Sequence, residues 1–303
     1  MNRFKSIIGV LGMSLLLFLV ACVKEVADND AQFQLQKSQL LKSKAEMTQS
    51  FRSVADATRA TGKKYFGTPH NGAAPDERAF LDNLTQELTR QRPDFSGKTE
   101  IRLTKVWNPK SESLSDYMSA NGVSEKVIAY SNTLKTNLEA AGAKFEGQIN
   151  QGQFESKEML ASVNQVFQDM EKNILEDRNL TESEKLTLLA STTAGTELTS
   201  AWVDVYQDFK FNLINKKEGW AWLRALGNAI ITIAIIVAVV VTIAAIVVAI
   251  GAGTAGVGWA AIGAFFLTTQ GTAILGGGAA ALYGVLFDCR GVCVFPDDDC
   301  YCH

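Results

Sequence analysis

The 303-residue chain carries 29 basic and 32 acidic residues, a formal net charge of −3 at pH 7. This length is enough for one to three domains. Because basic residues are not in excess, the composition argues against nucleic-acid binding. The apolar residues concentrate at the two ends of the chain, and the part from about Val23 to Gly219 is polar and charged.

The first residues have the pattern of a secretory signal. Arg3 and Lys5 precede the apolar stretch Ile7–Leu19, which is too short to span a membrane as a mature helix. The stretch ends in Leu19-Val20-Ala21-Cys22, which resembles the lipobox of bacterial prolipoproteins. The alternatives are an ordinary signal peptide and an uncleaved helix in which the cysteine stands by chance.

The resemblance covers residues 1–22 and implies a lipidated mature protein. Residues 1–21 would be the signal peptide, and Cys22 would carry a thioether-linked diacylglycerol and usually an N-acyl chain such as palmitate. Two or three such chains hold a protein on a bilayer. The expected location is therefore the bacterial cell envelope, with the main domain outside the cytoplasm. Val23 is not a membrane-retention aspartate, so the sequence leaves open which membrane holds the protein.

The next segment, residues 22–62, is predicted to be a lipidated tether with a first helix. Apolar residues recur at roughly helical spacing from Lys24 to about Thr61. Glycines and prolines over Gly62–Pro75 predict a loop. A short helix is expected from Asp76 to about Arg90.

Residues 63–219 are predicted to form an α-helical extracytoplasmic domain, apart from one region. The alternation in "KTEIRLTKVW", within Pro93–Pro109, suggests a small β-hairpin. A helix capped by Ser124 is expected to end at Gly142. Its apolar face consists of Val127, Ile128, Ser131, Leu134 and Leu138.

Two further helices have clear amphipathic faces, and together these elements predict a helical bundle. Over residues 158–175 the face comprises Met159, Leu160, Val163, Val166, Phe167, Met170 and Ile174. Thr181 and Glu184 form a capping-box pattern for the next helix, which Gly195 is expected to interrupt. After the interruption its face comprises Trp202, Val205, Tyr206, Phe209 and Leu213.

No pattern in the chain predicts an enzyme or a bound cofactor. The methionine and aromatic stripes are typical of a packed core. His70 has no second histidine near it in the sequence, and no known catalytic fingerprint is present.

Residues 220–288 are predicted to be an apolar helical hairpin, with spans at about 229–250 and 259–287. No charged residue occurs between Arg224 and Asp288. A helix over 229–250 would be roughly 33 Å long, close to the thickness of a hydrocarbon core. Trp220, Trp222 and Arg224 precede it like residues of a membrane interface.

The sequence of the second span, 259–287, is less apolar than that of the first span and predicts close packing against another helix. Gly276, Ala280 and Gly284 recur every fourth residue, which places small residues on one face. If the hairpin starts outside the cytoplasm, its basic flank opposes the positive-inside tendency. A second objection is that helical spans are unusual in outer membranes. Three alternatives stay open: retention in the inner membrane, a bacterium with a single membrane, and a hairpin held in protein until it enters another cell's membrane.

The tail, residues 289–303, contains the remaining four cysteines. Cys289, Cys293, Cys300 and Cys302 suggest two disulfides, in any of three pairings, with a zinc site as the alternative.

Two functions fit these observations. The first is a non-enzymatic envelope scaffold or assembly component, whose partners are the lipid bilayer and a second copy or another envelope protein. The second is a pore-forming or antagonistic protein that inserts its Gly-rich hairpin into a target membrane, similar in composition to the hydrophobic hairpin of pore-forming colicins.

Overall fold

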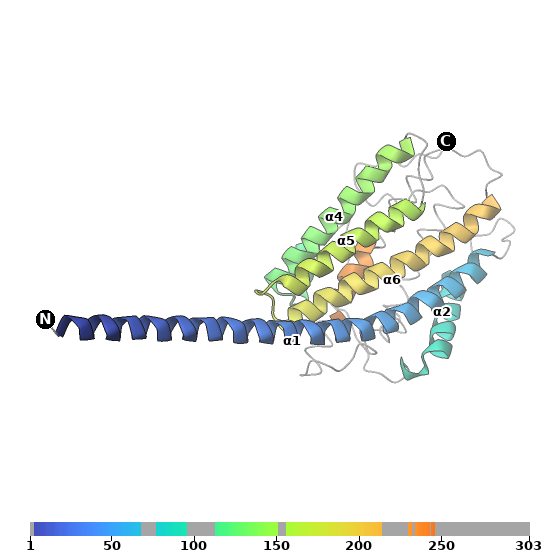
Figure 1. Ribbon diagram of the computed structural model, residues 1–303. Helices are drawn as coiled ribbons and strands as arrows, with labels where there is room; N and C mark the ends of the chain where they lie inside the picture. The colour runs from blue at the N-terminus through green and yellow to red at the C-terminus, as the bar shows by residue number, and fades with distance from the viewer. Residues whose placement is uncertain are drawn as a thin grey trace. The chain divides into compact units, whose positions relative to one another are not determined.

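The computed structural model describes residues 3–67, 77–95, 113–150, 156–213, 230–231, 234–242 and 244–245. The chain divides into two compact units, Met1–Lys42 and Ser43–His303. Every regular element in the described part is helical, and these residues contain no strand. The predicted all-α class is therefore confirmed for this part of the chain (Figure 1).

Helix α1, Arg3–Gly67, is the long helix that the spacing predicted, and it extends beyond the predicted end. In the second unit its buried residues follow one another at intervals of four and three: Met47, Phe51, Val54, Thr58 and Thr61. The predicted loop is wrong for Gly62–Gly67, which are helical. At Gly62 an added Cβ would lie 2.6 Å from Val205 Cγ2, so this glycine permits close helix contact rather than a turn.

Helix α2, Glu77–Gln91, confirms the predicted short helix and covers part of the core. Its buried residues Phe80, Leu84 and Leu88 lie one turn apart. The ring of Phe80 stacks on Trp202, with centroids 6.1 Å apart. Residues 93–95 form a 3₁₀ turn, η1 (Pro93–Phe95), and the alternating stretch of the predicted hairpin, residues 98–107, lies outside the described part.

Helix α3, Leu114–Ala120, was not predicted, although both of its ends carry signals in the sequence. The Ser113 hydroxyl accepts a hydrogen bond from the backbone N–H of Asp116, as an N-cap does. At the other end Gly122 has a φ of 77°, and the N–H of Val123 donates to the carbonyl of Met118. This is a Schellman motif, which ends the helix with a left-handed glycine.

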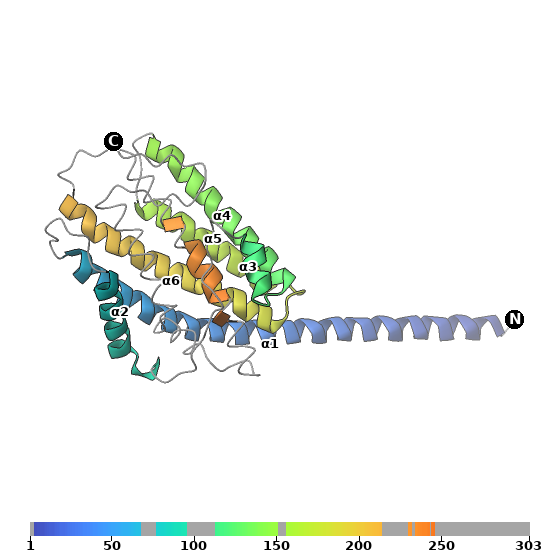
Figure 2. The ribbon, with the colours of Figure 1, turned by 180° about the vertical axis from the view of Figure 1, so that it is seen from behind.

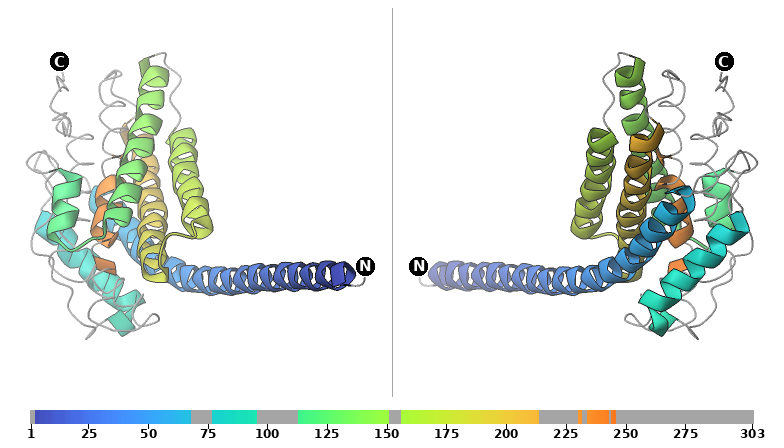
Figure 3. Two further views of the ribbon diagram at one scale, coloured as in Figure 1. Left: turned by 90° about the vertical axis from the view of Figure 1, so that its left-hand side faces the viewer. Right: turned by 90° about the vertical axis from the view of Figure 1, so that its right-hand side faces the viewer.

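Three helices form the centre of the second unit: α4 (Glu125–Asn150), α5 (Ser156–Glu176) and α6 (Glu182–Leu213). All three pairs among them are in contact (Figures 1 and 3). The predicted face of α4 is confirmed, since all five of its residues are buried. In α5 the predicted face is buried except for Leu160 and Val166, which are half-buried.

Two glycines predicted to end or interrupt helices lie inside them instead. Helix α4 continues past Gly142, and α6 continues through Gly195. An added Cβ at Gly195 would lie 2.4 Å from Phe167 Cζ, because the ring of this α5 residue lies against the bare α6 backbone. Glycine often ends a helix as a C-cap and lowers helix propensity, but at Gly195 it allows tight packing between two helices.

Helix α6 lies at the centre of the bundle. It contacts α4 and α5, and its Trp202 and Val205 meet α2 and α1. From Lys185 to Val205 most of its residues are buried, on all sides of the helix. Several of them are hydroxyl residues: Thr187, Ser191, Thr192, Thr193 and Thr199. An interior helix needs no polar face, which explains its weak amphipathicity.

The predicted caps of α4 and α6 are confirmed, and one carboxylate serves both. Glu184 Oε2 accepts a hydrogen bond from the N–H of Thr181 at 2.8 Å, and the N–H of Glu184 donates to the Thr181 hydroxyl. This reciprocal pair is the capping box. Glu184 Oε1 also accepts a hydrogen bond from the Ser124 hydroxyl. That hydroxyl in turn accepts a hydrogen bond from the N–H of Val127 in α4.

Candidate membrane-insertion site

Part of the predicted first span belongs to the helical domain. Residues 230–231, 234–242 and 244–245 are helical and nearly all buried (Figure 2, orange). We call them the apolar segment. Over 234–242 only Ile236 is half-buried and all the others are buried, which covers more than two helical turns. This stretch is therefore enclosed on nearly every side.

Helices α4 and α6 supply the described contacts of the apolar segment. On α4, an added Cβ at Gly142 would lie 3.9 Å from Ile231 Cβ. On α6, the Ser191 hydroxyl donates to the backbone carbonyl of Ala238 at 2.8 Å. The same carbonyl accepts a hydrogen bond from the Thr242 hydroxyl, also at 2.8 Å. Both hydroxyls thus find backbone acceptors, as buried polar groups require.

Within the described residues, no helix combines the length and apolarity needed to cross a membrane. The apolar segment is described for only part of the predicted span, and 259–287 lies outside the described part. A helix that is apolar on all sides suits either a protein core or a membrane. The described contacts place this one among protein helices.

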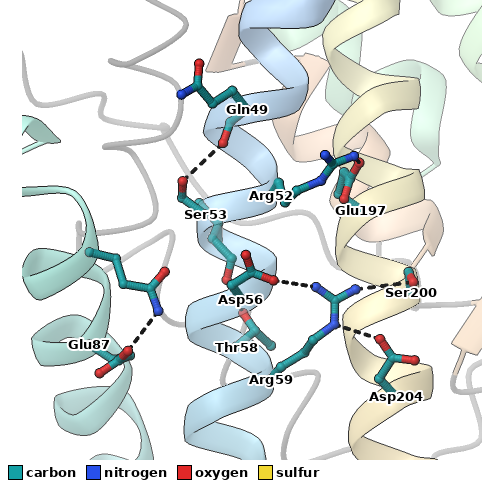
Figure 4. A network of polar contacts seen from close by, with 12 residues as sticks. Gln49, Arg52, Ser53, Asp56, Thr58, Arg59, Glu87, Glu197, Ser200 and Asp204 are labelled. Atoms are coloured by element: carbon teal, nitrogen blue, oxygen red, sulfur yellow. Dashed lines mark hydrogen bonds and ion pairs between the residues drawn. The ribbon is translucent and has the colours of Figure 1, made fainter.

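A cluster of ion pairs joins α1 to α6 on the second unit (Figure 4). Arg52 Nη2 lies 3.1 Å from Glu197 Oε1, and Arg59 Nε lies 2.7 Å from Asp204 Oδ2. We call these four residues the clasp. The hydrogen bond and charge of Glu197 raise the pKa of Arg52 above its ordinary value. Arg52 is therefore cationic at every physiological pH.

The clasp aligns the two helices in parallel. Both pairs join residues 145 positions apart, so α1 and α6 run in the same direction along the contact. Arg59 also donates to Asp56 Oδ1 on its own helix at 2.8 Å and to the Ser200 hydroxyl at 3.3 Å. Arg59 thus contacts three oxygen-bearing side chains, whereas Arg52 is 61% exposed. Each clasp pair has one side chain that is at least 43% exposed, so solvent weakens both pairs.

A third ion pair joins α1 to α5. Lys44 Nζ donates to Glu171 Oε2, and the other oxygen of Glu171 accepts from the Thr192 hydroxyl of α6 at 3.2 Å. The side chain of Glu171 is 11% exposed and that of Lys44 is 31% exposed. One carboxylate therefore links three helices beneath the surface.

The α1 and α6 helices also contain polar atoms without partners. In the described part of the chain, Thr61 Oγ1, Thr199 Oγ1 and Trp202 Nε1 are buried and have no hydrogen-bond partner. Each such group costs about 1–3 kcal/mol relative to a satisfied one. These unpaired groups lower the free energy of unfolding of the bundle.

Most residues singled out from the sequence lie beyond the described part. This holds for Trp220, Trp222 and Arg224, for the packing residues Gly276, Ala280 and Gly284, and for all four tail cysteines. Cys22 lies within α1, and its side chain is not described. The described residues contain no group of three or more acidic, cysteine or histidine side chains suited to a metal.

The clasp and the Lys44–Glu171 pair were not predicted. The signal available was the spacing of Arg52 and Arg59, which puts both on one flank of the α1 core stripe. Their partners are far away in the sequence, so no local pattern could identify them. No protein-family model matches the chain, and neither curated proteins nor solved structures gave a match.

Proposed function

We propose that this protein is a lipid-anchored bacterial envelope protein that carries an apolar helix inside its bundle and inserts that helix into a target membrane. The observation that carries the proposal is the nearly complete burial of residues 234–242, in which the Ala238 carbonyl accepts a hydrogen bond from Ser191 of α6. The whole stretch from 225 to 287 lacks charge, so its transfer into lipid meets no charged residue.

Enclosure of the segment answers the difficulty that the sequence raised. A lipidated protein with an exposed apolar hairpin would be held in the first membrane that it meets. A bundle that covers the segment allows export and sorting, with the acyl chains on Cys22 as the only initial anchor. The basic flank at Lys216, Lys217 and Arg224 then need not obey the rule for ordinary insertion.

The contact between α4 and the apolar segment provides a direct test. In Gly142→Cys/Ile231→Cys the two Cβ atoms would lie about 3.9 Å apart, within the range of a disulfide. We expect the oxidised variant to leave dye-loaded vesicles intact and the reduced variant to release the dye. The full chain carrying Cys22→Ala should be used, so that acylation plays no part.

Two controls separate the new cross-link from the native cysteines. The unmodified pair, Gly142 and Ile231, in the same oxidant and reductant shows what the tail cysteines contribute. The single variant Gly142→Cys shows the effect of the added side chain alone. Dye release that is equal in the oxidised and reduced double variant would contradict insertion of the segment.

The second candidate function is a lipid-anchored scaffold in which the apolar segment is a permanent core helix. The Ser191–Ala238 hydrogen bond favours it, because a polar contact between interior helices is typical of a fixed core. A protein of this kind would release no dye in either redox state, yet would still be retained on membranes when acylated.

A further inference from the structure

The part of helix α1 that lies in the second unit, residues 43–67, has a basic surface beside its buried apolar stripe. Residues 43–67 contain five basic and two acidic side chains. Lys44, Arg52, Arg59 and Lys63 fall on one flank of the helix, within about 100° of arc at 3.6 residues per turn. The buried stripe that starts at Met47 lies next to this flank.

Lys44, Arg52 and Arg59 are neutralised by carboxylates of the bundle. Lys44 pairs with Glu171 of α5, and the clasp pairs the two arginines with α6. Separated from α5 and α6, this part of α1 would be a basic amphipathic helix, with an apolar stripe and a cationic flank. Helices of this kind lie in the interface of bilayers that contain anionic lipid.

We propose that an anionic phospholipid surface replaces Glu197 and Asp204 as the partner of Arg52 and Arg59, so that α1 leaves α6 and lies on the bilayer. This inference rests on the proposed function and supplies its trigger. Phosphate groups suit arginine as well as carboxylates do, because both accept two parallel N–H hydrogen bonds. The clasp is thus an internal substitute for lipid headgroups.

The energetics favour such an exchange. Each clasp pair has one side chain that is at least 43% exposed, so solvent screens both pairs. Each cation near an anionic surface strengthens binding about fivefold. The buried hydroxyls of Thr61 and Thr199 have no partner in the closed state, so separation of the helices costs them no hydrogen bond. The two bonded states of the arginines are therefore close enough in free energy to be switched by the surface.

Breaking the clasp affects the packing of the apolar segment through α6. This helix contacts α1 at Val205 and the apolar segment at Ser191. Once α1 leaves, α6 loses the packing on one side and can separate from Ala238. The clasp residues themselves lie away from that contact along the helix, so they regulate insertion without taking part in it.

Two double variants test the exchange. Arg52→Gln/Arg59→Gln and Glu197→Gln/Asp204→Asn both break the clasp, but only the first removes the groups that meet lipid. In sedimentation with anionic vesicles, we expect the arginine variant to bind about 30-fold more weakly than the carboxylate variant. The carboxylate variant should bind at least as tightly as the unmodified clasp. Equal binding by the two variants would overturn the proposal, as would equal binding to anionic and zwitterionic vesicles.

A cross-link between the helices tests the movement itself. In Gly62→Cys/Val205→Cys the Cβ atoms would lie about 3.4 Å apart, at the short edge of the disulfide range. The oxidised form should lose binding to anionic vesicles and the reduced form should regain it. Circular dichroism of every variant checks that the helices remain folded.

The two cross-links separate this inference from the proposed function. If the 62–205 disulfide leaves vesicle binding and dye release unchanged while the 142–231 disulfide blocks release, the trigger is wrong and insertion stands. If neither disulfide affects release, both are wrong.

Discussion

At the residue scale, the carboxylate of Glu184 supports the N-terminal caps of two helices. The Glu184 carboxylate accepts hydrogen bonds from the Thr181 N–H at the start of α6 and from the Ser124 hydroxyl at the start of α4. Burial raises the pKa of Glu184, but these hydrogen bonds outweigh it and lower the pKa below its ordinary value. The N–H of Asn179 and the hydroxyl of Tyr130 lower the pKa of Asp177 in the adjacent turn.

These two depressed pKa values predict a loss of stability in acid. A carboxylate whose folded pKa lies below its unfolded value stabilises the fold above the unfolded pKa and ceases to do so as the pH falls through the folded pKa. The free energy of unfolding should therefore fall as the pH drops below about 4.5 for Glu184 and below about 3.8 for Asp177. These are the ordinary pKa values of the two carboxyl groups.

Urea denaturation across this pH range checks the prediction. Because other carboxylates, such as Glu87 with a pKa of about 2, titrate in the same window, the comparison is with Asp177→Asn/Glu184→Gln. This variant should lose about 1 kcal/mol at neutral pH through its weakened caps. Its further loss in acid should be smaller than that of the unmodified chain, and an equal loss would show that the two groups do not contribute.

The residue scale also shows where local sequence signals suffice. Thr181 and Glu184 identify a helix start because both partners lie in one turn of chain. Ser113 and the Asn121-Gly122 pair carried equally local signals for α3, which the sequence analysis missed. Gly142 and Gly195 could not be assigned locally, because Ile231 and Phe167, the residues that need their bare backbone, come from other helices.

At the scale of elements, α1 is attached to the bundle by charge as well as by packing. The Lys44–Glu171 pair differs from the clasp because both of its side chains are at most 31% exposed and its carboxylate also accepts a hydrogen bond from the Thr192 hydroxyl. Removal of the lysine leaves that carboxylate without its cation. Removal of the lysine alone should therefore cost more than breaking an exposed pair does.

Lys44→Met should lower the free energy of unfolding by about 2 kcal/mol. Lys44→Met/Glu171→Met should recover most of the loss, because an apolar pair leaves no buried charge. Arg90→Met is the matched control, since it breaks an exposed pair with Glu87 and should change little. Thermal denaturation distinguishes these variants, and a double variant no more stable than the single one would contradict the buried-charge explanation.

The sequence predicted where helices form better than it predicted which helices contact one another. The apolar spacing of α5 defined both its limits and most of its buried face, because that helix has one clear polar side. In α6 the face was harder to define, since burial on all sides removes the contrast on which periodicity depends. The clasp depends on residues 145 positions apart, which no single-sequence pattern reveals.

At the scale of the whole molecule, the uninterrupted apolar sequence after Arg224 admitted two environments. Lipid and a protein core both favour a helix that is apolar all round, so composition alone could not choose between them. The contacts with Gly142 and Ser191 show the apolar segment among protein helices. We propose that the same segment occupies both environments in turn, first the bundle and then a membrane.

Depth-dependent quenching tests this claim most directly. Ile236 is the one half-buried position in the described apolar segment, so a fluorescent label on Ile236→Cys should disturb the bundle least. With vesicles of anionic lipid brominated along the acyl chain, the account predicts an unquenched label in solution and strong quenching once the protein binds. A label that stays unquenched on vesicle-bound protein would contradict it.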